Sequence, residues 1–438
     1  MIDLLYIHPF SGLLDNLIVP TGVIPLVNRV NCSKRGLFWF EVNDRDIANS
    51  RIIALDLHWF YSLYPVRRLC AKIKKINPAI KIILGGYTAT LFAGILISEL
   101  ECDYIIKGDA DHTFPLLVDN ILNGCVSSDV PNLVARSFST PFAYSLDGSG
   151  FDKCDYLNVD WFPSFKKGRS QYSLYGCRTF IQAVKGCINN CEGCYGNNYF
   201  QSLLCNRGLI KRSAGSIRKE IRHYSNAKEI SCIQIHSDFI NIFGLSELEE
   251  IFSERYDLEL FYVFEKFYDN PAVYRLLARS FKKVRIFLPV YDIQEGRKIP
   301  IPAERLENLL KQSRELENIA LVLVLSDNIP RELKSYLKAN DRNLRNVFLR
   351  FGSDFLIDVP APQDSYADLY KEYIRCLKAS KHKFYDVRFR LAVFFYKLKE
   401  EDPRIGSLMR GIYYYAHKQV LFNFFRFKKL RHFLFCYC

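Results

Sequence analysis

Residues 179–198 read TFIQAVKGCINNCEGCYGNN, and this stretch decides the fold. An apolar strand pattern over Thr179–Val184 runs into three cysteines, Cys187, Cys191 and Cys194, spaced C-x3-C-x2-C. Glycines before, within and after the loop let the backbone wrap closely around a ligand. Three thiolates at this spacing, on a loop that follows a strand, predict a metal site.

The identity of the metal has three alternatives. A 4Fe–4S cluster usually takes four cysteines, so three would leave one iron open for a small-molecule ligand. A zinc ion would need a fourth ligand, which Cys177 or Cys205 could supply. A chance group of buried cysteines is the third alternative. We favour the iron–sulfur cluster, because the loop follows the strand that opens a series of alternating strands and helices.

That series runs from the cysteine loop to residue 351, and six strands with crossover helices predict a (β/α)6 partial TIM-type barrel. The strands are expected at Thr179–Val184, Glu229–Ile235, Leu258–Phe264, Val284–Val290, Ala320–Leu325 and Asn346–Phe351. The helices are expected at Ser216–Tyr224, Leu245–Glu254, Pro271–Arg279, Pro302–Leu316 and Pro330–Asn340. Asp238, Glu265 and Tyr291 follow the second, third and fourth strands, so they are expected at one mouth of the barrel.

A separate alternating series precedes the loop and predicts a doubly wound parallel sheet. The strands are expected at Ile2–Ile7, Phe38–Val42, Ile52–Leu57, Lys81–Leu84 and Tyr104–Lys107. The helices are expected at Gly22–Val30, Tyr64–Ile76, Leu91–Glu99 and Thr113–Asn123. Ligands of such sheets bind at the carboxyl ends of the strands, where Gly-Gly and Gly-Asp turns fall in this sequence.

These turns give the candidate binding residues of the first unit. Paired glycines let the backbone approach a bulky ligand, and threonine hydroxyls can bond its polar tail. The candidates are Asp56, His58, Gly85, Gly86, Thr88, Thr90, Gly108 and Asp109.

The chain therefore divides into an N-terminal α/β domain over residues 1–140, a linker over 141–175, a barrel over 176–362 and a helical C-terminal region over 363–438. The segment 411–438 is aromatic and basic, with no acid. We favour a packed helix that closes the barrel, and contact with a membrane surface is the alternative.

Composition limits the class of protein. The 438 residues carry a net charge of +13, with 49% hydrophobic and 24% charged residues, as in an ordinary globular protein. This excludes a disordered, collagen-like or coiled-coil chain. No apolar run approaches the roughly 18 residues of a membrane span. Asp3 and the lack of a basic leader argue against a secretory signal, so a cytoplasmic location is expected.

The cysteine loop resembles that of the radical S-adenosylmethionine (SAM) superfamily. The flanking segments Ile210–Ser213 and Ile233–Phe239 also resemble those around its second strand. The resemblance implies that Cys187, Cys191 and Cys194 bind three irons and that SAM chelates the fourth. An electron from the cluster then cleaves SAM to a 5′-deoxyadenosyl radical. The SAM contacts that it implies are Tyr195, Gly196, Asn197, Asp238, Glu265 and Tyr291.

Two positions depart from the superfamily pattern. Gly193 stands where many members have an aromatic residue, and Tyr195 is expected to take over its packing against adenine. The second strand ends in Ser237-Asp238 instead of two acids. Both departures concern the SAM contacts and leave the iron ligands in place.

The first unit resembles the cobalamin-binding domain of cobalamin-dependent radical SAM enzymes, on the Gly85–Thr90 and Gly108–Asp111 segments. Members that ligate cobalt through histidine carry D-x-H-x-x-G after the first strand. Here Asp56-Leu57-His58 follows the third, and Tyr61 replaces the glycine. We therefore expect no histidine ligand to cobalt and place His58 in the lining of the cofactor pocket.

The resemblance implies a cobalamin-dependent radical SAM enzyme, most consistent with a methyltransferase acting on an unactivated carbon of a metabolite, natural product or peptide. An external one-electron reductant of the flavodoxin or ferredoxin type is implied as partner. The alternatives are cyclisation or rearrangement with the same cofactors, radical modification of RNA, and a zinc-containing corrinoid carrier. Nucleic acid is disfavoured, because the positive charge is spread and no RNA-binding module is present. No catalytic residue can be named from the sequence.

Overall fold

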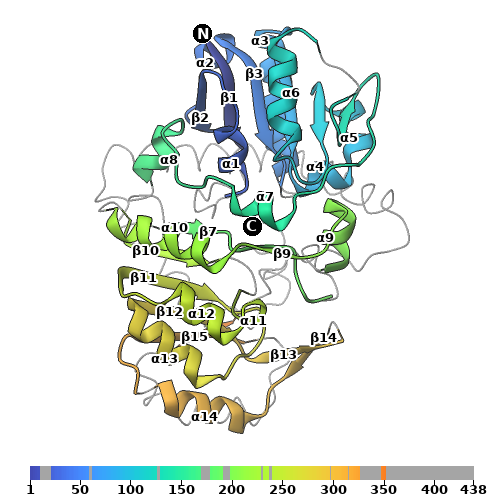
Figure 1. The fold of residues 1–438 in the computed structure, drawn as a ribbon. Coiled ribbons are helices and arrows are strands. Elements are labelled where there is room, and N and C mark those ends of the chain that lie inside the picture. The colour runs from blue at the N-terminus through green and yellow to red at the C-terminus, as the bar shows by residue number, and fades with distance from the viewer. Residues whose placement is uncertain are drawn as a thin grey trace, which may run out of the picture.

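The computed structural model describes residues 1–9, 21–58, 62–125, 129–168, 178–190, 198–227, 230–235, 239–295, 297–313, 315–325 and 347–351. Two six-stranded sheets organise this part of the chain, one from residues 2–135 and one from residues 178–351 (Figure 1). Two short two-stranded sheets accompany them. Of the described helices, none is long and apolar enough to cross a membrane. The expected C-terminal helices lie outside the described residues.

The first sheet has the order β2-β1-β3-β4-β5-β6, and only β6 runs antiparallel to its neighbour. The strands are β1 (Ile2–His8), β2 (Lys34–Phe38), β3 (Ser50–Asp56), β4 (Lys81–Gly85), β5 (Tyr104–Ile106) and β6 (Leu133–Ala135). The central strands are almost wholly apolar because helices cover both of their faces. The order 2-1-3-4-5 puts a topological switch point between β1 and β3.

Two buried clusters show how the helices cover this sheet. On one face α1 (Val23–Asn28) and α6 (Thr113–Leu122) pack with the aromatic residues of segment 161–165. On the other face lie α2 (Asp44–Ala48), α3 (Leu63–Ile76), α4 (Tyr87–Leu91) and α5 (Ala93–Glu99). The predicted α/β sheet with mainly parallel strands is confirmed.

The second sheet is wholly parallel, and its order β7-β10-β11-β12-β15-β16 follows the chain. The strands are β7 (Arg178–Ile181), β10 (Cys232–Ile235), β11 (Tyr256–Val263), β12 (Phe281–Pro289), β15 (Ile319–Leu325) and β16 (Val347–Phe351). One large core joins one face of it to α10 (Ala214–Asn226), α11 (Phe239–Ile242), α12 (Leu245–Ile251), α13 (Pro271–Ser280) and α14 (Ala303–Ser313). Sequential parallel strands with their helices on one face have the winding of a βα barrel. Closure into a (β/α)6 barrel remains a prediction.

Several short elements flank the two sheets (Figure 1). These are α7 (Gly148–Asp152), α8 (Pro163–Gly168), α9 (Asn198–Cys205) and the antiparallel pair β8 (Val184–Lys185) and β9 (Ile210–Lys211). A second antiparallel pair, β13 (Tyr291–Gln294) and β14 (Arg297–Pro300), follows β12. The segment expected to be a linker buries Phe151, Tyr156 and Phe162, so its described part is packed. The domain boundaries remain predictions.

The structure corrects several expected elements. The strand expected at Phe38–Val42 instead occupies Lys34–Phe38, because two charged residues begin this edge strand and obscure its apolar pattern. The strand expected at Thr179–Val184 divides into β7 and β8, which join different sheets. The helix expected at Leu91–Glu99 begins earlier, as α4, and is interrupted at Phe92. The helix expected at Pro330–Asn340 lies outside the described residues.

Candidate functional site

The cysteine loop begins where β8 ends. Gly186 has φ of +103°, and a Cβ there would lie 3.0 Å from the Leu209 Cα, so this turn requires glycine. Cys187 is partly buried, and its Sγ accepts a hydrogen bond from the Asn189 backbone N–H at 3.4 Å. An N–H group directed at sulfur stabilises a thiolate, which is the form that binds metal.

Two hydrogen bonds hold together the ends of the rest of the loop. The Asn198 N–H donates to the Asn189 carbonyl at 2.8 Å, and the Tyr199 N–H donates to the Asn190 side chain at 3.0 Å. These bonds join the described residues before segment 191–197 to those that begin α9. Cys191, Cys194, Tyr195, Gly196, Asn197 and Asp238 lie outside the described residues. Among those described, no group of three His, Cys, Asp or Glu side chains could hold a metal.

Cys205, one alternative fourth ligand for zinc, is described. It is buried at the end of α9, and burial raises the pKa of its thiol to about 12, with the Asp109 charge adding to the shift. Without a metal, this environment favours the neutral thiol. Cys177, the other alternative, lies outside the described residues.

Glu265 and Tyr291 both lie at the carboxyl edge of the second sheet. Glu265 is partly exposed just after β11 ends, and Tyr291 is buried at the start of β13. The Phe267 N–H donates to the Tyr291 carbonyl at 2.7 Å, which ties the segment after β11 to the hairpin after β12. The structure thus brings these two predicted residues to the same edge, and their contact with SAM remains a prediction.

The switch point of the first sheet holds a buried polar group. The Tyr6 hydroxyl donates to the Asp56 carboxylate at 2.5 Å, and the His8 Nδ1 lies 3.1 Å from the same oxygen. Asp56 was predicted from the sequence, whereas Tyr6 and His8 were missed. Their signal was two polar groups spaced by two at the end of the buried run 4–8, which places both on one face. At the switch point, ligands of doubly wound sheets bind.

His58 and Tyr87 add aromatic surface beside this group. Their ring centroids are 4.3 Å apart with an interplanar angle of 32°. The Tyr87 hydroxyl accepts a hydrogen bond from the Gln201 side chain of α9 at 2.8 Å, and burial raises its pKa to about 12. The carboxyl end of β4 is thereby linked to the helix that follows the cysteine loop.

The predicted threonines and two of the predicted glycines have structural roles of their own. Thr88 Oγ1 donates to the His58 carbonyl at 3.0 Å, and Thr90 Oγ1 accepts from the Gly108 N–H at 3.0 Å. A Cβ on Gly108 would lie 2.6 Å from the Phe142 ring, and one on Gly86 would lie 2.8 Å from the Leu57 carbonyl. Gly85 differs, because a Cβ there would meet nothing within 4 Å. Contacts of these residues with a cofactor remain predictions.

This contrast between adjacent glycines gives a testable prediction. Gly86→Ala is expected to lower the free energy of unfolding by about 2 kcal/mol or more, because φ is +104° and the clash is with backbone. Gly85→Ala is the matched control and should leave the free energy of unfolding nearly unchanged. Urea unfolding of the apoprotein measures both, and equal losses would contradict the assignment.

His58 predicts a pH dependence. Burial is the largest cause that lowers the pKa of His58, to about 4; the Asp56 charge opposes the shift and His8 adds to it. Between pH 6.5 and about 4 the unfolded chain then binds more protons at this site than the folded chain. The contribution of His58 to the free energy of unfolding is therefore complete above pH 6.5. It is lost as the pH decreases toward 4, and the loss amounts to about 3 kcal/mol.

Replacement of His58 by glutamine should remove this part of the acid sensitivity. We expect the variant to lose less stability than the wild-type apoprotein between pH 6.5 and 4, as measured by urea unfolding at a series of pH values. His223→Gln, on the exposed face of α10, is the control and should follow the wild type. Parallel curves for His58→Gln and wild type would contradict the lowered pKa of the His58 imidazole.

Asp109 lies in an ion-pair network and not on an open edge. Arg207 donates to both of its carboxylate oxygens, at 2.7 and 3.1 Å, and the Leu146 N–H donates at 3.1 Å. Burial alone would raise the pKa of Asp109, but Arg207 and Lys185 outweigh it and lower the pKa. Sequence reasoning missed Lys185 and Arg207, which come from the second half of the chain.

Comparison with known proteins supports the architecture. No protein-family model matches the sequence, and no curated protein matches it. Among solved structures, the radical SAM methyltransferase TsrM from Kitasatospora setae, with tryptophan and a SAM analog bound, matches with a TM-score of 0.56 and 14% identity, over 80% of this chain and 73% of TsrM. TsrM with cobalamin and a [4Fe–4S] cluster gives 0.55 and 15%, over 80% and 72%.

A second enzyme shows the same arrangement. The cobalamin-dependent SAM radical enzyme OxsB, with aqua-cobalamin and SAM bound, matches with a TM-score of 0.52 and 11% identity. The match covers 86% of this chain and 56% of OxsB. At these identities the likeness concerns the fold. The chain has the mixed α/β fold, with parallel sheets, of the cobalamin-dependent radical SAM enzymes.

Proposed function

We propose that the protein is a cobalamin-dependent radical SAM enzyme and that it transfers a methyl group to an unactivated carbon. The observation that carries the proposal is the junction of the two sheets. The turns after β4 and β5 contact α9 and β8, which flank the cysteine loop. A cofactor site on the switch-point edge and a cluster on the loop would therefore be neighbours.

The residues present fit the two bound groups. For the cluster, Cys187 offers a partly buried sulfur supported by a backbone N–H, and Cys191 and Cys194 complete the motif. For the corrin, the carboxyl edge of the first sheet offers three features. They are the open position at Gly85, the His58–Tyr87 ring pair and the Tyr6–His8–Asp56 group. The His58 imidazole is neutral at pH 7, because its pKa is lowered to about 4.

When bound, these cofactors supply radical formation from SAM and methyl transfer; the protein supplies binding and orientation. Glu265 and Tyr291, at the carboxyl edge of the second sheet, would contact SAM together with Tyr195, Gly196, Asn197 and Asp238. Cofactors and substrate held between the two carboxyl edges would be shielded from water, which protects a reactive radical from side reactions. The substrate, the external reductant and the role of the C-terminal region belong to this proposal.

Analysis of the reconstituted protein tests the proposal. After anaerobic reconstitution, we expect about four iron and about four sulfide ions per chain, together with bound corrinoid. With SAM, reductant and a substrate, methyl transfer gives S-adenosylhomocysteine and 5′-deoxyadenosine together. 5′-Deoxyadenosine alone, with turnover, would overturn methyl transfer in favour of cyclisation or rearrangement. Zinc in place of iron would overturn the radical chemistry, and iron without corrinoid would overturn the role given to the first sheet.

A further inference from the structure

Four charged side chains form a buried network between the turn after β5 and the start of the cysteine loop. The side chains of Asp111 and Asp109 are 1% and 6% exposed, and those of Arg207 and Lys185 are 9% and 12% exposed. The Lys185 Nζ lies 3.3 Å from an Asp111 oxygen and 3.8 Å from an Asp109 oxygen. Two positive and two negative charges therefore balance within the network.

Neighbouring groups fix the network further. The Arg29 guanidinium, from the end of α1, donates to the Asp111 carbonyl at 2.8 Å, and the Cys154 Sγ donates to the Asp111 carboxylate at 3.4 Å. Arg207 also approaches the Lys185 carbonyl, at 3.4 Å. Segments from both halves of the chain thus converge on two aspartates of a single turn.

The place of Lys185 in the sequence gives this network its consequence. Lys185 is the last residue of β8, and only Gly186 separates it from Cys187. The turn that carries Asp109 and Asp111 lies at the carboxyl edge of the first sheet, directly after Gly108. The ion pairs of Lys185 with Asp109 and Asp111 therefore connect the segment before Cys187 to the edge of the first sheet that would carry the corrin.

Resting on the proposed function, we infer that Asp109, Asp111, Lys185 and Arg207 are positioning residues that set the distance between the cluster and the corrin. Because these ion pairs are buried, removing one partner is strongly destabilising, since the other charge would remain buried without a partner. The network therefore resists separation of the cysteine loop from the first sheet. None of the four residues needs to contact either cofactor for this role.

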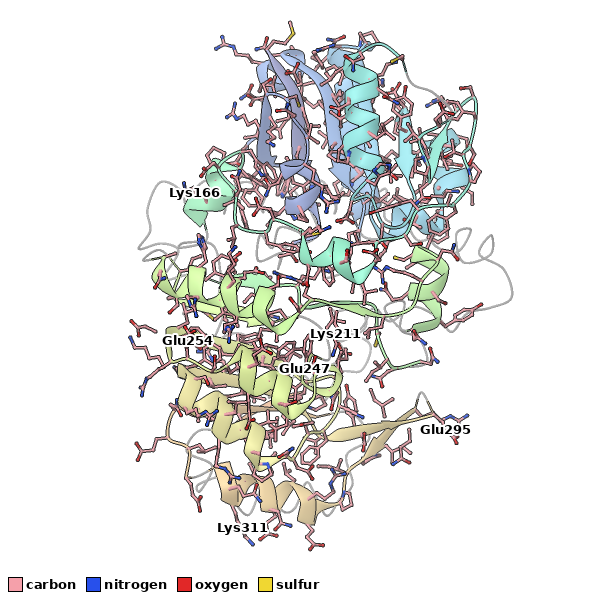
Figure 2. All side chains as sticks on the ribbon, in the orientation of Figure 1. Lys166, Lys211, Glu247, Glu254, Glu295 and Lys311 are labelled. Carbon is pink, nitrogen blue, oxygen red and sulfur yellow. The ribbon has the colours of Figure 1, made fainter. Side chains whose placement is uncertain are left out.

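The test uses a charge-balanced double variant, Lys185→Met with Asp111→Asn, which removes the central pair and leaves Asp109 with Arg207. The matched control is Lys166→Met with Asp160→Asn, an exposed pair that joins α8 to the segment before it at 2.6 Å (Lys166 is labelled in Figure 2). Both variants are reconstituted with cluster and corrinoid, and their iron and corrinoid contents are compared with those of the wild type.

The decisive readout is the magnetic dipolar coupling between the reduced cluster and cob(II)alamin, measured by pulsed electron paramagnetic resonance. In the wild type and the control we expect a narrow coupling, that is, a dipolar coupling with a narrow distribution of values. We expect this narrow coupling to be lost in the Lys185/Asp111 variant with both cofactors still bound. Hydrogen exchange of residues 183–190 in the apoprotein should also become faster, by about tenfold or more. A merely structural role would not change the coupling while cofactor contents are retained.

The outcomes separate the two proposals. A wild-type protein that binds no cluster or no corrinoid overturns the proposed function and this inference with it. A wild type that binds both, with an unchanged narrow coupling in the Lys185/Asp111 variant, overturns the inference alone. Lys185→Arg, which retains the positive charge, is expected to keep the narrow coupling of the wild type, and its loss in this variant would count against the ion pair as the cause.

Discussion

Replacement of Cys187 by alanine is expected to remove the iron–sulfur cluster and to abolish SAM cleavage. A cluster held by three protein cysteines cannot be assembled stably with two. The iron content should therefore fall from about four per chain to a small fraction of that amount. The Cys187 side chain is only partly buried, and its Sγ accepts a hydrogen bond from a loop N–H. The substitution should therefore leave the folded chain intact.

The measurement compares iron, sulfide and corrinoid in anaerobically reconstituted Cys187→Ala, Cys191→Ala and a control. Cys125→Ala is a suitable control, because Cys125 is an exposed free cysteine outside both sheets. Corrinoid binding should survive in all three variants, since its proposed site lies on the first sheet. Retention of iron in Cys187→Ala would show that this cysteine is not a cluster ligand, and parallel loss of corrinoid would show a defect of the whole fold.

The sequence predicts the strands well where burial is two-sided. The strand expected at Ile2–Ile7 is found as Ile2–His8, and the strand expected at Ala320–Leu325 is found as Ile319–Leu325. Such strands are continuous apolar runs, so one residue type marks them. The edge strand Lys34–Phe38 has no such mark, because its first two residues are charged and its last residues continue into an apolar turn.

The candidate site is only partly predictable for a different reason. Local patterns identify the cysteine motif and the turns after β4 and β5, because each lies in one short segment. The network of Lys185 with Asp111 and Arg207 with Asp109 joins residues 74 and 98 positions apart, so no local pattern contains it. The glycine pair is also ambiguous in the sequence, because the two members have different surroundings. Gly86 lies against the backbone of Leu57, just after β3, whereas a Cβ on Gly85 would meet nothing within 4 Å.

Replacement of Glu220 by glutamine is expected to give the largest loss of stability. Glu220, on α10, forms an ion pair with Arg212, and the two side chains are only 3% and 4% exposed. Arg212 also donates to Ser216 Oγ at 2.8 Å and lies over the Tyr156 ring, 5.0 Å from its centroid. Without the carboxylate, a guanidinium charge would remain buried, which costs about 3 to 5 kcal/mol.

Urea unfolding of the apoprotein measures this loss as a lower free energy of unfolding. Glu254→Gln is the control: Glu254 (labelled in Figure 2) pairs with Arg222 on the exposed side of α10, and its loss should leave stability nearly unchanged. The double variant Arg212→Met with Glu220→Leu removes both charges and should recover much of the loss, because no buried charge then lacks a partner. A single variant as stable as the wild type would contradict the burial of the pair. A double variant less stable than Glu220→Gln would instead show that Arg212 stabilises the β9–α10 connection mainly through Ser216 and Tyr156.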